Sequence, residues 1–352
     1  MSGSRKRVAL ALQGGGSHGA FTWGVLDRLL EADLDVVAIS GTSAGSLNAA
    51  ALAYGHMLDG PGGAKKALDA LWQNVSKAGD RVFNPYRSGP LSLPHAWNID
   101  ASLLSVWLDM LSLVWSPYYN AFYENTLESV VKAAVPDFAK LNAYRRVKLF
   151  ICATNVQTNE RKIFRNGELS IETLTASCCL PNLYQAVEVA SQFYWDGGYI
   201  GDPALEPLLE ECSDIIIVQV NPMTRKALPM TAPDILDRLN EVSFNASLVL
   251  ELNTIQTVTK LVKNYILERD PEHRKYKPIR FHRIADDESM SELGRASKNN
   301  TSQRFLQYLH DIGRAAAGQW LDDSFDKIGR ESSMPRSFAK PYLDSADRNA
   351  SP

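Results

Sequence analysis

The sequence has no block of five like charges, no hydrophobic run of membrane-spanning length and only four cysteines in 352 residues. Lysine and arginine total 37 against 40 aspartates and glutamates, which gives a net charge of −3 at pH 7. A charge-balanced chain without a basic cluster lacks the electrostatic signature of a nucleic-acid-binding protein. We therefore expect no nucleic-acid partner.

The apolar stretches of the chain are too short for a membrane anchor. The longest, residues 103–115, is interrupted by Asp109 and falls short of the roughly 20 residues that span a bilayer. The five apolar residues after the basic N-terminus are too few for the core of a signal peptide. These features predict a cytoplasmic protein whose contact with a membrane would be peripheral.

The cysteines show no pattern typical of metal sites. They form no C-x-x-C pair and lack the spacing to histidines that a zinc site needs, so buried free thiols are expected at Cys152, Cys178, Cys179 and Cys212. The sequence therefore predicts no metal site.

Short apolar runs alternate with helical patterns along the chain. Two strand-then-helix units open the sequence, at 8–12 and 20–30 and again at 34–39 and 44–54, and further buried-strand runs follow at 147–153 and 215–220. Continuous apolar strands of this kind are typical of a sheet covered by helices on both faces. The predicted fold class is α/β, with a mainly parallel central sheet between layers of helices.

Three other regions differ in composition. Residues 84–119 hold four prolines and three of the seven tryptophans, which indicates a lid-like insertion. Residues 233–321 are mostly helical in pattern and predict a helical C-terminal extension packed on the first domain. Residues 330–352 are polar enough to predict a disordered tail.

A glycine-rich loop, Gly14-Gly15-Gly16-Ser17-His18-Gly19, separates the first predicted strand from its helix. It satisfies G-x-G-x-x-G, but the second strand ends without the acidic residue that would hold a ribose. The lysine of a Walker phosphate-binding loop is also absent. We expect no nucleotide cofactor here, and a plain turn remains the alternative.

A second motif, Gly41-Thr42-Ser43-Ala44-Gly45, ends the second predicted strand. Glycines two before and two after a serine allow a sharp strand-to-helix turn that exposes the hydroxyl, so Ser43 is a candidate nucleophile. Neighbouring parallel strands would place the glycine-rich loop beside Ser43 at the carboxyl edge of the sheet. Glycine amides there could bind an oxyanion, and losing one such donor typically costs about 2.7–4 kcal/mol of transition-state stabilisation.

A Ser-His-Asp triad is poorly supported. The downstream histidines, His273, His282 and His310, do not directly follow an apolar strand as a loop-borne triad histidine should. The acidic motif Trp195-Asp196-Gly197-Gly198-Tyr199 is by itself a hairpin-turn signal, in which the carboxylate caps local N–H groups. Because a serine nucleophile needs a base, Asp196 becomes the candidate base for Ser43.

At this point the sequence resembles the patatin-like phospholipase family over residues 6–222. The family's marks are a glycine-rich oxyanion loop, a Gly-x-Ser-x-Gly elbow and an Asp-Gly-Gly turn, in that order. The resemblance implies a Ser43–Asp196 dyad without histidine, an oxyanion hole from the amides of Gly14, Gly15 and Gly16, and supporting motif glycines at Gly19, Gly41, Gly45, Gly197 and Gly198. His18 departs from the family pattern, in which arginine or lysine is common.

The implied activity is hydrolysis of acyl lipids, of phospholipase A type, without metal or cofactor. An aspartate needs a raised pKa to deprotonate serine, and the aromatic residues around Asp196 are expected to supply a low-dielectric wall. Residues 103–115, apolar on nearly all faces, are either a lid for acyl chains or a core helix. Other esters or thioesters (storage polyesters, carboxylesters, acyl-CoA) and a non-enzymatic membrane-associated module remain alternatives.

Overall fold

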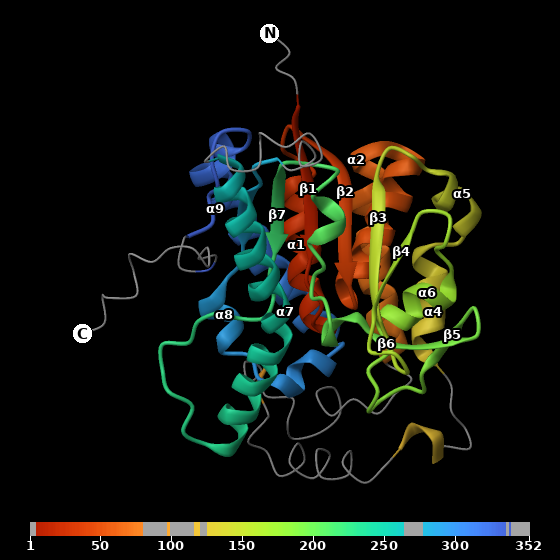
Figure 1. Cartoon of the computed structure of the whole chain (residues 1–352). Helices are drawn as coiled ribbons and strands as arrows, with labels where there is room; N and C mark the ends of the chain where they lie inside the picture. Colours follow the sequence, from red (N-terminus) through yellow and green to blue (C-terminus); the bar gives the residue numbers. More distant parts are fainter. Residues whose placement is uncertain are drawn as a thin grey trace.

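The alternating apolar runs and helical patterns produce a layered α/β fold (Figure 1). The computed structural model describes residues 5–79, 97–98, 116–119, 125–263, 277–335 and 338. Eight strands form one mixed sheet, in the order β5-β6-β3-β2-β1-β7-β8 with β4 also paired to β3. The predicted α/β class with a mainly parallel central sheet is confirmed.

The centre of the sheet is parallel. Its strands are β1 (Lys6–Leu12), β2 (Leu34–Thr42), β3 (Lys148–Asn155), β7 (Asp214–Val218) and β8 (Arg280–Ile284). All five residues of β7 are buried, as expected for a strand that helices cover on both faces. The carboxyl ends of these strands therefore meet at one edge of the sheet.

The other side of the sheet is antiparallel, which the sequence did not predict. It contains β4 (Arg161–Arg165), β5 (Val187–Val189) and β6 (Gln192–Asp196). β4 pairs with β3 over Phe150 to Thr154, so β2 and β6 share the opposite edge of β3. β2 pairs along β3 as far as Cys152, and β6 takes its place from Ala153 onwards.

Helices lie on both sides of the sheet (Figure 1). The α-helices are α1 (Gly19–Leu29), α2 (Ala44–Gly79, kinked at Asp59 and Gly60), α4 (Thr126–Ala134), α5 (Phe138–Ala143), α6 (Ile171–Ser177), α7 (Ala232–Lys263), α8 (Asp287–Ser291) and α9 (Gln303–Ser324). Short 3-10 helices are η1 (Gly16–His18), η2 (Pro117–Tyr119), η3 (Gly197–Tyr199), η4 (Glu206–Leu208), η6 (Arg295–Asn299) and η7 (Phe325–Lys327).

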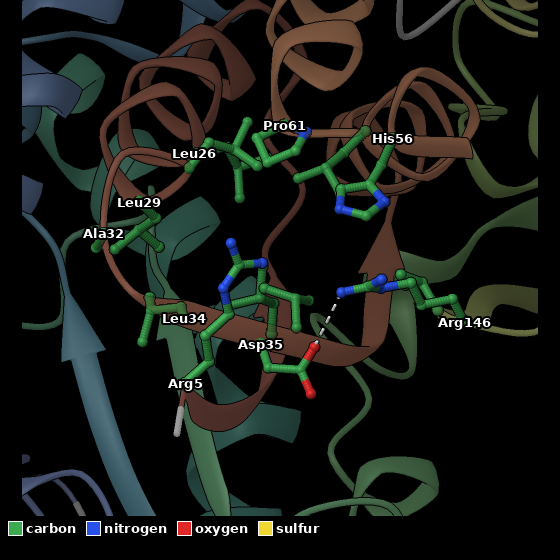
Figure 2. Close-up of a pocket in the computed structure, with 14 residues that line it drawn as sticks. Arg5, Leu26, Leu29, Ala32, Leu34, Asp35, His56, Pro61 and Arg146 are labelled. Atoms are coloured by element: carbon green, nitrogen blue, oxygen red, sulfur yellow. Dashed lines mark ion pairs between the residues drawn. The ribbon is translucent and has the colours of Figure 1, made fainter. Parts of the chain in front are cut away.

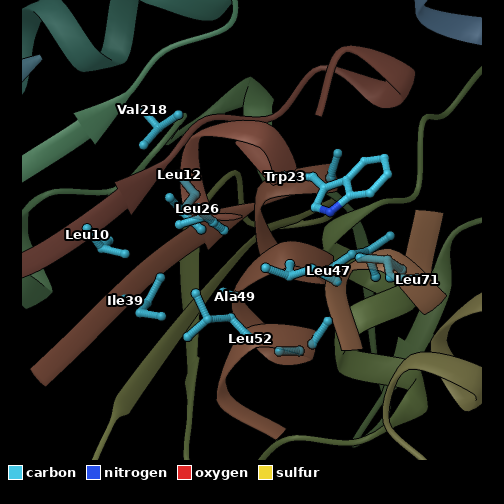
Figure 3. Packing of buried hydrophobic residues seen from close by; sticks show 14 of the residues in the cluster. Leu10, Leu12, Trp23, Leu26, Ile39, Leu47, Ala49, Leu52, Leu71 and Val218 are labelled. Atoms are coloured by element: carbon cyan, nitrogen blue, oxygen red, sulfur yellow. The ribbon is translucent and has the colours of Figure 1, made fainter. Parts of the chain in front are cut away.

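Alternate residues of the strands build two cores. On one face, Leu10, Leu12 and Ile39 of the sheet pack with residues of α1 and α2 (Figure 3). Residues of α9 belong to the same core. On the other face, small and branched residues of β1 and β7 pack under Leu248 and Leu252 of α7. Because side chains alternate along a strand, one apolar run supplies both cores.

The C-terminal region is mostly helical, as predicted, but it also contributes one strand to the sheet, which the sequence did not predict. β8 pairs parallel with β7 and extends the sheet. α9 crosses α1 so closely that a Cβ at Gly24 would lie 1.9 Å from the carbonyl oxygen of His310. The predicted disordered tail also began too early, because Ser332 and Met334 both hydrogen-bond to the backbone of Phe281 in β8.

Several predicted features lie outside the described residues. They include most of the insertion at 84–119, the apolar stretch 103–115, His273, and residues 336–337 and 339–352. From the insertion, the Trp97 ring packs on Phe305 of α9, with ring centres 5.0 Å apart. Within the part of the chain that the structure describes, no helix is both long and apolar enough to cross a bilayer.

Candidate active site

Ser43 lies at the carboxyl end of β2, directly before α2. Its φ of +53° is in the left-handed region, which a non-glycine residue rarely adopts without a functional reason. The turn is tight because the backbone of Gly45 approaches Leu12, where a Cβ on Gly45 would lie 2.2 Å from the carbonyl oxygen. The Ser43 amide donates a 3.1 Å hydrogen bond to Ser177 Oγ. The predicted strand-to-helix elbow is therefore present.

The glycine loop, residues 14–16, lies beside Ser43. A Cβ added to Gly14 would be 2.8 Å from Ser43 Cβ, so only glycine fits at this position. The Gly14 amide, however, donates a 2.6 Å hydrogen bond to Asp202 Oδ1 and is not free for an oxyanion. The amides of Gly15 and Gly16 donate no hydrogen bond to any residue that the structure describes. The predicted oxyanion site thus reduces to two open donors.

The pairing of the strands in the sheet brings Asp196 close to Ser43. It ends β6 and pairs with Ala153, one position beyond the pairing of Thr42 with Cys152, so it follows on from the end of β2. Its Oδ1 accepts a 2.7 Å hydrogen bond from the Gly198 amide. Its Oδ2 is buried and has no hydrogen-bond partner in the described parts of the chain. Oδ1 of the carboxylate therefore caps the local backbone, and Oδ2 is left without a hydrogen-bond partner among the described residues.

Burial raises the pKa of Asp196 to about 6, while hydrogen bonding from the Ser43 side chain and the Gly198 amide, and the charge of Lys298, act in the opposite direction. The strand register, in which Asp196 follows on from the end of β2, places the carboxyl group near Ser43. Oδ2 nevertheless has no hydrogen-bond partner among the residues that the structure describes, so it does not form a well-aligned hydrogen bond with the Ser43 hydroxyl.

The enclosure of Asp196 differs from the prediction. Of the aromatic residues around it, Phe193 and Tyr199 are 40% and 55% exposed, so they do not form a closed wall. Tyr194 is buried at 4% exposure, as are the free thiols, and the Asp196 amide donates a hydrogen bond to the carbonyl oxygen of Cys179 at 2.8 Å. Burial raises the pKa of the Cys179 thiol to about 12, so that group stays neutral. The prediction that the four cysteines are buried and unpaired is confirmed.

None of the histidines that the structure describes hydrogen-bonds to Ser43. Burial, together with the charge of Lys298, lowers the pKa of His18 to about 3, and its Nε2 lies 2.7 Å from Ser297 Oγ. His282 Nε2 lies 3.2 Å from Asp214 Oδ1 at the amino end of β7, and its Nδ1 lies 3.0 Å from Ser333 Oγ. His310 contacts Trp23 and Asp27 of α1.

A buried polar network behind the glycine loop was missed from the sequence. Gln13 Oε1 accepts the amides of Val220 and Asn221, and its Nε2 donates to Asn245 of α7 at 2.9 Å. Asp202 is fully buried, with burial raising its pKa well above the usual value. The one sequence signal for Asp202 was an acid six residues after Asp196. The side-chain partners of Gln13 lie 189 or more residues away in the sequence and have no local signature.

A cavity of about 60 Å³ lies at the opposite, amino edge of the sheet. Apolar residues such as Leu26 and Leu34 line it, and Arg146 pairs with Asp35 at its mouth (Figure 2). It is far smaller than the roughly 300–1,000 Å³ typical of ligand pockets and contains none of the candidate catalytic residues. We place the site by its chemistry at the carboxyl edge instead.

The similarity between this chain and the solved structures that match it is weak. VipD from Legionella pneumophila is 15% identical, with a TM-score of 0.39, and the match covers 91% of this chain and 67% of VipD. ExoU from the Pseudomonas aeruginosa type III secretion system, in complex with SpcU, is 14% identical, with a TM-score of 0.32, over 89% of this chain and 53% of that one. Likeness at this level carries no argument about function.

No curated protein matches the sequence. A family model described as patatin-like phospholipase matches residues 10–209, more than half of the chain. The matched range contains the glycine loop, the Ser43 elbow and the Asp196 turn. The chain therefore belongs to the patatin-like phospholipase family.

Proposed function

We propose that the protein is a serine hydrolase that cleaves the carboxylic esters of acyl lipids, with Ser43 as nucleophile and Asp196 as general base. The observation that best supports this is that a serine in a strained backbone conformation lies close to a buried carboxylate, one oxygen of which has no hydrogen-bond partner among the described residues. Family membership implies the acyl-lipid class of substrate.

In the proposed cycle, Asp196 takes the hydroxyl proton while Ser43 Oγ attacks the ester carbonyl. The resulting oxyanion accepts hydrogen bonds from the amides of Gly15 and Gly16, and Asp196 then gives the proton to the leaving alcohol. Water next attacks the acyl-serine, again deprotonated by Asp196, and Ser43 leaves with the proton. The raised pKa of Asp196 suits this role, because a more basic carboxylate accepts the serine proton more readily.

A lipid substrate also agrees with the surface near the site. Phe193 and Tyr199 flank Asp196 in sequence and expose 40% and 55% of their surface. Tyrosine is favoured at the boundary between water and lipid because it joins an apolar ring to a polar hydroxyl, and phenylalanine adds apolar surface that can enter the lipid. We propose that the protein contacts membranes peripherally when it takes its substrate.

A fluorophosphonate probe tests the chemistry. Wild-type protein should become covalently labelled at Ser43, whereas Ser43→Ala should stay unlabelled and Ser46→Ala, in the first turn of α2, should still react. If well-folded wild-type protein is not labelled, the non-enzymatic module becomes the better explanation.

Lipid hydrolysis tests the substrate class. Phospholipid vesicles incubated with wild-type protein should release free fatty acid, and Ser43→Ala should release none. Labelling by the probe together with turnover only of acyl-CoA, a polyester or a short carboxylester would keep the hydrolase and discard the lipid substrate.

A further inference from the structure

The side chain of Asn245, on α7, lies behind the glycine loop and uses all of its hydrogen-bonding capacity there. Its Oδ1 accepts hydrogen bonds from Gln13 Nε2 and Gln219 Nε2, each at 2.9 Å. Its Nδ2 donates to the backbone carbonyl oxygens of Asn221 at 3.3 Å and Pro222 at 3.1 Å. A side-chain amide has two acceptor positions and two N–H groups, so all four are used. Asn245 therefore joins the residue before the loop to the segment that follows β7.

The amide groups of this network can take only one arrangement. Gln13 must offer Nε2 to Asn245, because its Oε1 accepts two backbone amides. Gln219 must do the same, because its Oε1 accepts a hydrogen bond from Arg283, whose guanidinium can only donate. Gln13, Gln219 and Asn245 are at most 5% exposed, so a lost partner would leave a buried polar group unpaired.

The same network sets the path of the glycine loop. The amides of Val220 and Asn221 donate to Gln13 Oε1 at 2.9 and 2.8 Å. Asn221 Nδ2 also donates to the carbonyl oxygen of Gly14 at 3.4 Å. A Cβ on Gly15 would lie 2.8 Å from Val220 Cγ2, so the loop backbone packs directly on the segment after β7. A shift of that segment would therefore move the loop.

The amides of Gly15 and Gly16 depend on this support. They donate no hydrogen bond to any residue that the structure describes, so their direction is set by the residues around them. Donors of an oxyanion hole stabilise a transition state best when they are fixed before the reaction. α7 is a firm base for this purpose, because Leu248 and Leu252 lie on the same helix face as Asn245 and are fully buried in the core.

We propose that Asn245 is a positioning residue of the active site, which holds Gln13 and the segment after β7 in place and so directs the amides of Gly15 and Gly16 toward the oxyanion. This inference rests on the proposed hydrolase, and it gives α7 a part in the site. Asn245 lies outside the range 10–209 that the family model matches.

Kinetics on a soluble short-chain ester provide the first test. Asn245→Ala leaves Gln13 and Gln219 without their acceptor, so the loop should shift and kcat should fall by roughly 100-fold, the scale of a 1 Å misplacement. KM should change by less than about threefold, because the oxyanion donors act mainly in the transition state. Asn245→Asp keeps the size but turns an oxygen toward the carbonyls of Asn221 and Pro222, so it should lower kcat at least as much. Wild-type kcat in either variant would overturn the proposal.

Two controls separate positioning from a general loss of stability. Thr254→Ala removes an exposed hydroxyl of α7 that donates to the Leu250 carbonyl within the helix, and it should keep wild-type kcat. His282→Ala removes two buried hydrogen bonds near the amino end of β7, and its kcat should stay within about tenfold of wild type. An equal fall of kcat in His282→Ala and Asn245→Ala would indicate general loosening of the fold and overturn the proposal.

A double-variant cycle tests the connection through Gln13. Gln13→Ala should lower kcat to a similar extent as Asn245→Ala, and the double variant should be little worse than either, because both changes remove the same support. Losses of kcat that multiply in the double variant would show that the two residues act independently, which contradicts the proposal.

Amide hydrogen exchange tests the network without turnover. In wild-type protein, the amides of Val220 and Asn221 should be protected like those of β1, because they donate to a buried acceptor. In Asn245→Ala, these two amides and that of Gly14 should exchange at least about tenfold faster, while β1 keeps its protection. Should that variant fail to fold, the wild-type measurement decides, since fast exchange at Val220 and Asn221 would overturn the proposal.

The two measurements also separate this inference from the proposed function. Faster exchange in Asn245→Ala, together with a wild-type protein that is inactive on esters, would reject only the proposed hydrolase. Active wild-type enzyme with unchanged exchange and unchanged kcat in Asn245→Ala would reject only the positioning role.

Discussion

One carboxylate oxygen of Asp196 accepts the Gly198 amide at 2.7 Å, and the other has no hydrogen-bond partner among the residues that the structure describes. Each oxygen can thus be assigned a separate role. Oδ1 fixes the turn that follows β6, and Oδ2 can exchange a proton with Ser43. The turn interpretation and the base interpretation of the Asp-Gly-Gly motif are compatible, and substitution can separate them.

The first prediction concerns the dyad. Ser43→Ala and Asp196→Asn should each lower kcat by roughly 10⁴-fold, and the double variant should be no worse than either, because groups that act as a unit are non-additive. Asparagine can still accept the Gly198 amide, so the turn is preserved. Initial rates on a soluble ester, with thermal melting as the folding control, check this. Losses that multiply in the double variant would show that Asp196 does not act through Ser43.

The second prediction is an acid limb near pH 6. Asp196 works as a base only when deprotonated, and burial raises its pKa from 3.8 to about 6. The value of kcat/KM should therefore fall about tenfold per pH unit below pH 6 and level off above it. A profile of ester hydrolysis from pH 4.5 to 8, within the range where circular dichroism shows intact protein, measures it. An acid limb near pH 4 in the profile of kcat/KM would mean that the Asp196 carboxyl group is exposed to water rather than buried.

The third prediction separates stability from catalysis at the histidines. Alanine at His273, His282 or His310 should change kcat/KM by less than about tenfold, or roughly 1.4 kcal/mol in the barrier. His282→Ala should nevertheless lower the free energy of unfolding by about 1–3 kcal/mol, because it removes a fully buried side chain together with its two hydrogen bonds, to Asp214 and Ser333.

Urea unfolding and ester kinetics on the same preparations distinguish these outcomes. A kcat loss of roughly 10⁴-fold at one histidine, with folding intact, would restore a Ser-His-Asp triad and leave Asp196 as a turn residue.

The fourth prediction concerns the crossing of α1 and α9. Gly24→Ala places a methyl group where the His310 carbonyl now lies, so the helices must separate. We expect a loss of about 1–3 kcal/mol in the free energy of unfolding, the usual cost of overpacking.

Gly318→Ala is the matched control on α9. Its Cβ would meet only Arg28 Nε at 3.9 Å, and alanine favours helix, so stability should stay equal or rise by up to about 1 kcal/mol. Equal losses at both positions, measured by urea unfolding, would show that the crossing is not closely packed.

The sequence by itself determined the elements and motifs whose requirements are local. Apolar periodicity predicted β1, α1, β2 and the start of α2, because burial on one or both faces imposes a short-range pattern. Glycine spacing predicted the Ser43 elbow, because a sharp strand-to-helix turn needs small neighbours. The net charge, the spacing of the cysteines and the lengths of the apolar runs could also be taken directly from the sequence.

Only the tertiary structure decided how the site is completed. Asp196 reaches Ser43 because β6 takes over the edge of β3 where β2 ends, a pairing that no local pattern specifies. The Gly14 amide donates its hydrogen bond to Asp202, and Lys298, which contacts Gly16, lies more than 280 residues after the glycine loop in the sequence. Contacts between residues so distant in sequence depend on shape and burial in the folded chain, which leave no periodicity or spacing in the sequence.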